Sequence, residues 1–540
     1  MDVASMQSRF EERIFGFQQV AGAELLKKKQ ENYAVELRKK IRSQNTTKRR
    51  AVVSGHSFLL HYSEKENVSV GNLPFHLIKM NPELASPDVN PIEKLRIIRE
   101  IMVEDTDRNV LDQGLEVLAG VLKIEVDTPF STIVYLGFIP ILQRLMDYKY
   151  PTPIVLNATM CLANICNGPH EYASHVFKLD GIHSFLRIIS SRNIQPTIMA
   201  IRGLANLCGD CYEFSTAIIE SNLINQLSQL LENCRDDNLE LMAVISHLAR
   251  NITQNADDIS IEQIDKIVQW IGKLIIFQDP EIKDDCLKAL RNISKCEDNK
   301  KIELILENNL GEFCVQSLGN YEENLLKNAS KIIANFFALD IEITQQLLDC
   351  GVLDKLLQLI NHPSSEIRRS VYLALSNILC GTNYQKTKYL DHEIAAFSMR
   401  GLEDADANVK LECSTMLKNF INTSEYGLTL KLIELRIFDY LKNALDNDIE
   451  PDFLNNILSI CDGLLEAGKQ EQYRIRDVSN QIALMFEESG CLDVLENIIG
   501  NMEVGDIFQY AQQIHEEYFG QSFDSTDTKI YEVPAIFEFS

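Results

Sequence analysis

Apolar residues recur at helical spacing along most of the chain, in blocks of about eight to twelve residues separated by polar or glycine-containing joints. The segments EIRRSVYLALSNIL and GVLDKLLQLI are examples, each with an apolar stripe of the kind that one face of a helix buries. Glycines such as Gly168, Gly209, Gly351 and Gly381 mark joints where a helix ends and the chain turns. The pattern predicts an all-α protein without a β-sheet.

A short signature centred on asparagine recurs at a nearly constant interval. The signatures are ANIC at Asn164, ANLC at Asn206, RNIS at Asn292, ANFF at Asn335, SNIL at Asn377 and KNFI at Asn419. Successive asparagines are 42, 86, 43, 42 and 42 residues apart. The interval of 86 residues is about twice the others, and the segment SHLARN around His247 lies in its middle. A period of this length is typical of an α-solenoid, in which stacked repeats bury each other's apolar faces. We expect about ten repeats over residues 91–520, each a helical hairpin with a short extra helix.

The two ends of the chain depart from this pattern. Residues 1–56 contain six Lys and six Arg against six acidic residues, a formal charge of +6, whereas the other residues together carry −32. A basic segment on an acidic body favours basic partners for the body and argues against nucleic-acid binding by it. Residues 57–90 have little periodicity and predict a flexible linker, and residues 521–540 form a polar tail.

The cysteines and histidines do not predict a metal site. Cys208 and Cys211 form a C-x-x-C without a second pair, and the other cysteines lie mainly in apolar helical segments. The histidines are scattered, and His170 and His175 are expected to be solvated polar residues. The phosphate-binding, dinucleotide-binding, zinc-protease and serine-hydrolase motifs are absent, and no run of about eighteen apolar residues occurs. We expect an intracellular protein that is not an enzyme, needs no cofactor or metal, and does not insert into membranes.

The period and the (A/S)-N-(I/L) signature resemble the armadillo family, and three segments narrow the resemblance to importin-α. AIRGLANLCGDCYEF resembles the third importin-α repeat, residues 485–519 are similar to the last repeat, and AVELRKKIRSQNTTKRR at residues 34–50 resembles the importin-β-binding segment. The resemblance implies a right-handed superhelix, a nuclear import adaptor that shuttles between cytoplasm and nucleus, and an export receptor that acts with Ran-GTP. It implies that importin-β binds Arg38, Lys39, Lys40, Arg42, Lys48, Arg49 and Arg50, the last three of which could also fold back into the groove.

The resemblance also implies a cargo groove that binds nuclear localisation signals. Side-chain amides can pair with the backbone of an extended peptide, and acids at the rim can select its Lys or Arg side chains. The matching positions are Asn164, Asn206, Asp210, Asn377, Asn419 and Glu412. Each asparagine could instead bridge neighbouring helices.

The chain departs from the family at the groove tryptophans, which provide slots for lysine stems. His247 stands where the fourth repeat would have its Asn, and the tryptophan positions hold Met160, Arg202, Ala243, Lys288, Leu373 and Thr415. The single tryptophan, Trp270, lies in a second-helix segment and is expected to pack in the core. We therefore expect weak binding of lysine-rich signals. The alternative function is a non-transport armadillo scaffold in a cytoskeletal or signalling complex.

Overall fold

A computed structural model describes residues 74–520, except for short gaps at residues 87–88, 105–106, 123–127, 192, 234–237, 340, 423, 425, 448–449, 477–478 and 502–504. The basic segment 1–56, residues 57–73 of the predicted linker, and the tail 521–540 lie outside the described residues. The described residues form α-helices and short 3₁₀ helices, and no strand occurs among them. The all-α prediction is confirmed for this part of the chain.

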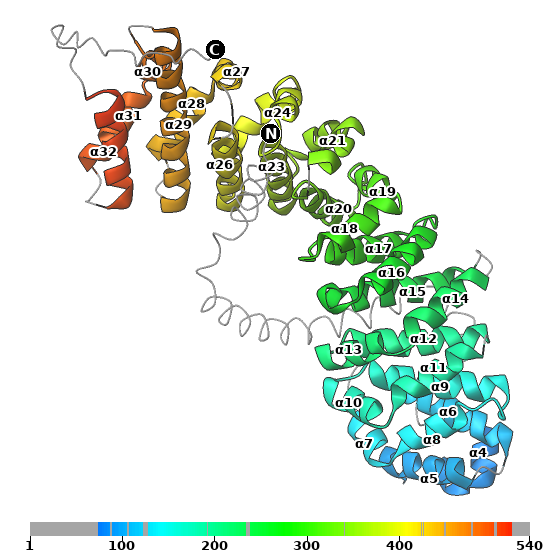
Figure 1. Ribbon diagram of the computed structural model, residues 1–540. Helices are drawn as coiled ribbons and strands as arrows, with labels where there is room; N and C mark the ends of the chain where they lie inside the picture. Colours follow the sequence, from blue (N-terminus) through cyan, green and yellow to red (C-terminus); the bar gives the residue numbers. More distant parts are fainter. Residues whose placement is uncertain are drawn as a thin grey trace. The chain divides into compact units, whose positions relative to one another are not determined.

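The chain divides into two compact units, with the boundary between Cys314 and Val315. The helices of the first unit are α4 (Phe75–Met80), η2 (Pro82–Ala85), α5 (Pro91–Glu104), α6 (Arg108–Leu122), α7 (Phe130–Tyr135), α8 (Phe138–Leu145), α9 (Thr152–Cys166), α10 (His170–Lys178), α11 (Gly181–Ser190), α12 (Ile194–Cys208), α13 (Tyr212–Glu220), α14 (Leu223–Asn233), α15 (Leu239–Ile252), η3 (Thr253–Asp258), α16 (Ile261–Leu274), α17 (Pro280–Ile293) and α18 (Asn299–Glu307). The unit boundary falls within α19 (Leu310–Ser317). Figure 1 labels most of these helices.

The second unit continues the same succession of helices. They are α20 (Glu323–Phe336), α21 (Ile341–Asp349), α22 (Val352–Leu359), α23 (Ser365–Leu379), α24 (Asn383–Leu390), α25 (Ile394–Ser398), η4 (Met399–Glu403), α26 (Ala407–Asn422), α27 (Tyr426–Glu434), α28 (Ile437–Asn447), α29 (Pro451–Ile475), α30 (Gln481–Glu488), α31 (Cys491–Asn501) and α32 (Asp506–Tyr518).

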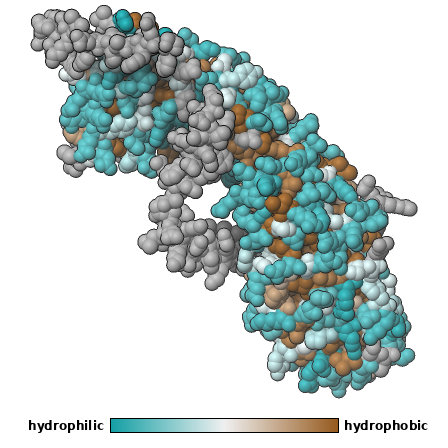
Figure 2. Space-filling model, viewed as in Figure 1, coloured by the Kyte–Doolittle hydropathy of each residue, from teal (hydrophilic) through white to brown (hydrophobic). Residues whose placement is uncertain are grey.

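Two short helices followed by a longer one make up most repeats, as α10, α11 and α12 show. In the first unit the third helices pack in sequence, α6 on α9, α9 on α12, α12 on α15 and α15 on α17. In the second unit α20, α23, α26, α29 and α32 do the same. We call the row of third helices in either unit its third-helix layer. Leu204 and Leu375, both fully buried, illustrate the apolar face that each third helix contributes to the core, while Figure 2 shows polar residues over much of the visible surface.

The turn between the first and second helices repeats as well. In six repeats a residue with positive φ lies directly before the second helix; these residues are Gly137, Asp180, Asn309, Gly351, Arg436 and Gly490. Glycine adopts this left-handed conformation without steric cost, and Asn and Asp tolerate it better than other residues. The turn lets two short helices reverse direction within a few residues.

The helices begin earlier than the sequence predicted. Residues 57–90 were expected to form a flexible linker, but α4 and η2 lie within them and α4 packs against α6. Leu77 and Leu84 are fully buried in this contact region. The linker prediction is therefore wrong for these residues, because their apolar side chains cover the end of the first repeat. None of the described helices combines the length and apolar character that crossing a bilayer requires.

Candidate peptide-binding surface

The signature asparagines lie near the C-terminal ends of the third helices. Asn164 is on α9, Asn206 on α12, Asn377 on α23 and Asn419 on α26, and all four are half-buried. The equal position in each helix follows from the constant repeat length, because each third helix packs on the preceding one in the same register. The structure therefore places the predicted asparagines of each unit on successive members of its third-helix layer.

Most of these amides bridge neighbouring third helices. The Nδ2 of Asn206 donates to the carbonyl of Ala163 at 3.2 Å, and that of Asn377 donates to the carbonyl of Ala334 at 2.9 Å. In the same way Asn419 donates to the hydroxyl of Ser376 at 2.9 Å. Each bond holds the amide in one orientation against the preceding repeat.

In the fourth repeat the bridging amide belongs to Asn251, whereas the sequence predicted that His247 occupies the asparagine position. Asn251 is 4% exposed, and its Nδ2 donates to the carbonyl of Ala205 at 2.8 Å. His247 lies one turn earlier, with its Nε2 3.3 Å from the same amide nitrogen. A Cβ on Gly209 would lie 2.9 Å from Asn251 Nδ2, so the close packing of this amide requires glycine there.

This register corrects two assignments. The residue four positions before the bridging amide is His247, so His247 and not Ala243 occupies the position where the family has tryptophan. Asn456 on α29 also bridges third helices, since its Nδ2 donates to the hydroxyls of Ser414 and Thr415 at 3.1 and 3.2 Å, but these partners lie about one turn before the register of the signature asparagines. The string RNIT at Asn251 resembles RNIS at Asn292, and this similarity could have located Asn251.

Asn164 differs from the other asparagines because its amide nitrogen is buried and has no hydrogen-bond partner among the described residues. An unpaired buried donor costs about 1–3 kcal/mol. A buried water molecule would remove this cost.

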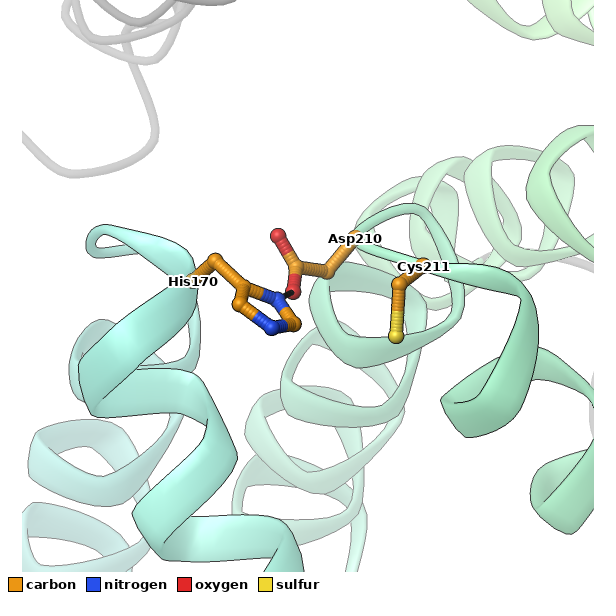
Figure 3. A group of neighbouring side chains, drawn as sticks. All are labelled: His170, Asp210 and Cys211. Carbon is orange, nitrogen blue, oxygen red and sulfur yellow. Dashed lines mark hydrogen bonds and ion pairs between the residues drawn. The ribbon is translucent and has the colours of Figure 1, made fainter. Parts of the chain in front are cut away.

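The two predicted acids already contact basic side chains of the chain. Asp210 follows α12, and its carboxylate lies 2.5 Å from Nδ1 of His170, the first residue of α10 (Figure 3). Arg369 on α23 donates from Nε and Nη2 to one oxygen of Glu412 on α26, at 3.0 and 2.9 Å. The acids are largely covered, with side chains 13% and 16% exposed, whereas His170 and Arg369 are 54% and 55% exposed.

Other acids of the third-helix layers are paired as well. Arg250 donates to Asp285 at 2.9 Å, and His247 lies 3.6 Å from the same carboxylate. Burial would raise the pKa of Asp285, but the neighbouring His247 side chain and the charge of Arg250 hold that pKa below its ordinary value. Further pairs join Lys288 to Asp284, Lys331 to Glu366, and Arg368 to Asp404.

The positions expected to replace groove tryptophans are half-buried and chemically mixed; they are Met160, Arg202, Lys288, Leu373 and Thr415. Burial lowers the pKa of the Arg202 guanidinium, and the nearby charge of Glu240 partly offsets this effect. Trp270 is 2% exposed, and its indole N–H donates to Ser228 at 3.0 Å. The prediction that this tryptophan packs in the core is confirmed.

The described cysteines are mostly buried, and none forms a disulfide. Burial raises the pKa of Cys208 to about 12 and that of Cys296 to about 12. Cys211 is half-buried beside Asp210, and its pKa is raised, chiefly by burial. The C-x-x-C pair thus separates into one core residue and one residue at the surface.

Comparison with known proteins shows which repeat family and which curated proteins the chain resembles. The armadillo/β-catenin-like repeat family matches residues 340–380, which contain α21, α22 and α23 with Asn377. Among curated proteins, rice importin subunit alpha-1b is 24% identical over 49% of this chain and 49% of its own length. Importin subunit alpha-3 of Arabidopsis thaliana is 23% identical over 63% of this chain and 60% of its own. Rice importin subunit alpha-1a is 21% identical over 78% and 80%.

The chain is a divergent importin-α-like armadillo-repeat protein. Its fold class is the all-α armadillo solenoid, and the crystal structure of an engineered protein aligns with 79% of this chain and 98% of its own at a TM-score of 0.66 and 20% identity. The matches span about half of the first curated relative and three fifths of the second. The predicted resemblance is thereby confirmed, while the binding residues stay predictions. The cationic residues of the basic segment 1–56, which we call the basic arm, lie outside the described residues.

Proposed function

We propose that this protein binds extended peptides across its third-helix layers and acts as a nuclear import adaptor. Support comes from the curated relatives, which are importin alpha subunits, and above all from the asparagines repeated on successive third helices. Peptide backbone groups repeat along an extended chain, so a row of amides can pair with them whatever the peptide sequence.

Bridging between helices is compatible with this role. A side-chain amide has two N–H donors and one carbonyl acceptor, and the bridge to the preceding helix uses one donor. In Asn206 and Asn377 that bridge fixes the plane of the amide, so less side-chain entropy is lost when a peptide binds.

The charge of the surface favours weak or selective binding of basic cargo. Asp210 and Glu412 are the acids proposed to select Lys or Arg, and each is paired with His170 or Arg369. A cargo cation must displace these partners, and Arg202 adds repulsion near the same region. The proposed cargo is therefore a basic peptide with apolar residues among its cations, bound less tightly than a groove lined with tryptophan would allow.

The proposed partners follow from the same function. Importin-β would bind the cationic arm through Arg38, Lys39, Lys40, Arg42, Lys48, Arg49 and Arg50, and an export receptor with Ran-GTP would return the protein from nucleus to cytoplasm. The protein would thus shuttle between these compartments. It would act by binding alone, without catalysis.

The test is peptide binding by the full chain, measured by fluorescence anisotropy with a labelled lysine-rich signal. Asn206→Ala should weaken binding by about two- to tenfold, because one hydrogen bond contributes about 0.5–1.5 kcal/mol. Lys266→Ala, a change on the second helix α16, serves as the control and should leave binding unchanged. Equal affinity of the wild type and Asn206→Ala, with both proteins folded by circular dichroism, would contradict the proposal.

A non-transport scaffold is the second candidate function. The basic residues Arg202 and Lys288, at positions where the importin-α family has groove tryptophans, favour it slightly. Such a scaffold would prefer acidic or mixed peptides. Tighter binding of an acidic peptide than of the lysine-rich signal, together with no capture of importin-β by the full chain, would decide for the scaffold.

A further inference from the structure

Three side chains that can ligate a metal converge between two neighbouring repeats of the first unit. They are His170 at the start of α10, and Asp210 and Cys211 in the joint between α12 and α13 (Figure 3). The imidazole nitrogen, carboxylate oxygen and thiol sulfur that they offer all lie within 4.8 Å of one another. The sequence alone does not indicate this group, because His170 and Asp210 are 40 residues apart and meet only when repeats stack.

We infer that His170, Asp210 and Cys211 form a binding site for a borderline-soft divalent cation such as Zn²⁺. One imidazole, one thiolate and one carboxylate form a ligand set that suits zinc and not magnesium or calcium, which prefer oxygen ligands. Three protein ligands leave a fourth tetrahedral position for water or for a group of a bound partner. The site does not depend on the proposed transport function.

The imidazole is held in place by its surroundings. Its ring stacks on Phe214 of α13, with ring centroids 5.5 Å apart and an interplanar angle of 13°, and Phe214 stacks in turn on Phe177. Phe214 is 2% exposed, so the helix that follows Cys211 also fixes the orientation of His170. Such outer contacts commonly orient metal-ligating histidines.

The hydrogen bonds of His170 direct one ring nitrogen to the site. Ser174 donates its hydroxyl hydrogen to the backbone carbonyl of His170 at 2.8 Å, and its oxygen lies 3.3 Å from Nε2, where it can accept the Nε2–H. The other ring nitrogen, Nδ1, faces the carboxylate of Asp210 and hydrogen-bonds with it. A metal cation bound between these two groups would take the place of that hydrogen bond.

Small side-chain movements would complete the coordination. Zinc bonds of about 2.0–2.3 Å place ligand atoms of a tetrahedral site roughly 3.3–3.7 Å apart. The His170–Asp210 pair, now at 2.5 Å, would open by about 1 Å, and the sulfur of Cys211 would approach. His170 is 54% exposed, and Cys211 is half-buried, so a cation can reach the site from solvent.

The test uses the full chain freed of metal with a chelator and titrated with Zn²⁺ and with Co²⁺. We expect saturable binding of one ion per chain, and a thiolate-to-cobalt charge-transfer band that Cys211→Ser abolishes. His170→Ala should weaken binding at least about tenfold, equal to about 1.4 kcal/mol, whereas His175→Ala on the same helix should have no effect. Cobalt binding without a thiolate band, or no saturable binding at micromolar Zn²⁺, would overturn the inference.

A second readout does not rely on the cobalt spectrum. Zn²⁺ should slow the alkylation of Cys211 in the wild-type chain, measured by mass spectrometry of its peptide, and His170→Ala should remove this protection. The exposed Cys350 provides an internal control whose alkylation should not respond to Zn²⁺. Equal alkylation rates of Cys211 with and without Zn²⁺ would contradict the site and leave a His170–Asp210 ion pair without a metal.

Discussion

Glu412 and Asp210 illustrate how single residues bear on the proposed peptide binding. The sequence predicts both acids as cargo-selecting groups, and each contacts a basic side chain from an adjacent repeat. Under the proposed function a cargo cation would replace the contact with Arg369 or His170, so its net electrostatic gain would be small. The residue types of the site were predictable, but their partners were not, because those partners come from repeats about 40 residues away.

Removing Arg369 should therefore strengthen the binding of basic peptides. An exposed ion pair contributes about 0.2–1 kcal/mol, so Arg369→Ala should increase the affinity for a lysine-rich peptide by up to about fivefold. Lys431 lies on the first helix α27 and forms an exposed ion pair with Asp391. Lys431→Ala removes this ion pair and should leave the affinity unchanged. Fluorescence anisotropy with the full chain measures both, and weaker binding by Arg369→Ala would contradict competition for Glu412.

Asp285 predicts a stability effect that depends on pH. It connects α15 and α17 through Arg250 and His247, and its pKa in the folded protein is lowered. A lowered folded-state pKa contributes stability that is present above the unfolded value, about 3.9, and is lost as the pH falls through the folded value. Asp285→Asn should lower the free energy of unfolding by about 1–3 kcal/mol at pH 7, and the difference should shrink below about pH 4.

Urea unfolding at several pH values, followed by circular dichroism, measures this effect. Glu262→Gln is the matched control, because Glu262 is 80% exposed and pairs with Lys266 within the single helix α16. It should leave the free energy of unfolding nearly unchanged. A difference for Asp285→Asn that persists undiminished at low pH would show that the ionised carboxylate is not responsible.

At the scale of the helices, the sequence predicted the third helices well and one register wrongly. The interval from Asn206 to Asn251 is 45 residues, because α15 begins at Leu239, six residues after α14 ends at Asn233. In the preceding repeat α12 begins four residues after α11 ends. A fixed period cannot locate such an insertion, and a period of about 42 residues from Asn206 falls near His247.

Two short elements were missed for a related physical reason. The helix α4 has six residues and η2 has four, so neither is long enough to show a period of 3.6 residues. Their stability comes from burying Leu77 and Leu84, which is a tertiary contact. Periodicity detects helices that bury a long stripe, and it does not detect short segments that cover the end of a stack.

The repeated turn with positive φ gives a prediction for paired glycines. Gly351, at φ 77°, precedes α22, whereas Gly272 lies inside α16 with open space where an added methyl group would lie. Gly351→Ala should lower the free energy of unfolding by about 1 kcal/mol, since alanine is strained at positive φ. Gly272→Ala should raise it by about 0.5–1 kcal/mol, because alanine favours the helix. Urea unfolding tests the pair, and destabilisation by both would contradict this account.

At the scale of the whole molecule, charge divides the sequence into a basic arm of +6 and a body of −32. Composition revealed this division without any structure. The metal-ligand cluster could not be found in the same way, because it requires the stacking of two repeats to bring His170 to Asp210 and Cys211. Composition therefore predicts classes of partner, while a site that spans repeats needs the packed fold.

The basic arm should bind importin-β chiefly through its charge. Ion pairs between exposed groups are screened within about 10 Å at 0.1 M salt, so the affinity should fall steeply as salt increases. Replacing Arg38, Lys39 and Lys40 together by Ala should weaken binding at least about tenfold and flatten the salt dependence. Replacing the exposed Lys79, Lys178 and Lys300 changes the net charge equally and should have little effect. Calorimetry with the full chain at several salt concentrations distinguishes the two sets, because an effect of total charge would weaken both equally. Unchanged binding after the triple replacement in the arm would assign the interaction, if any, to another surface.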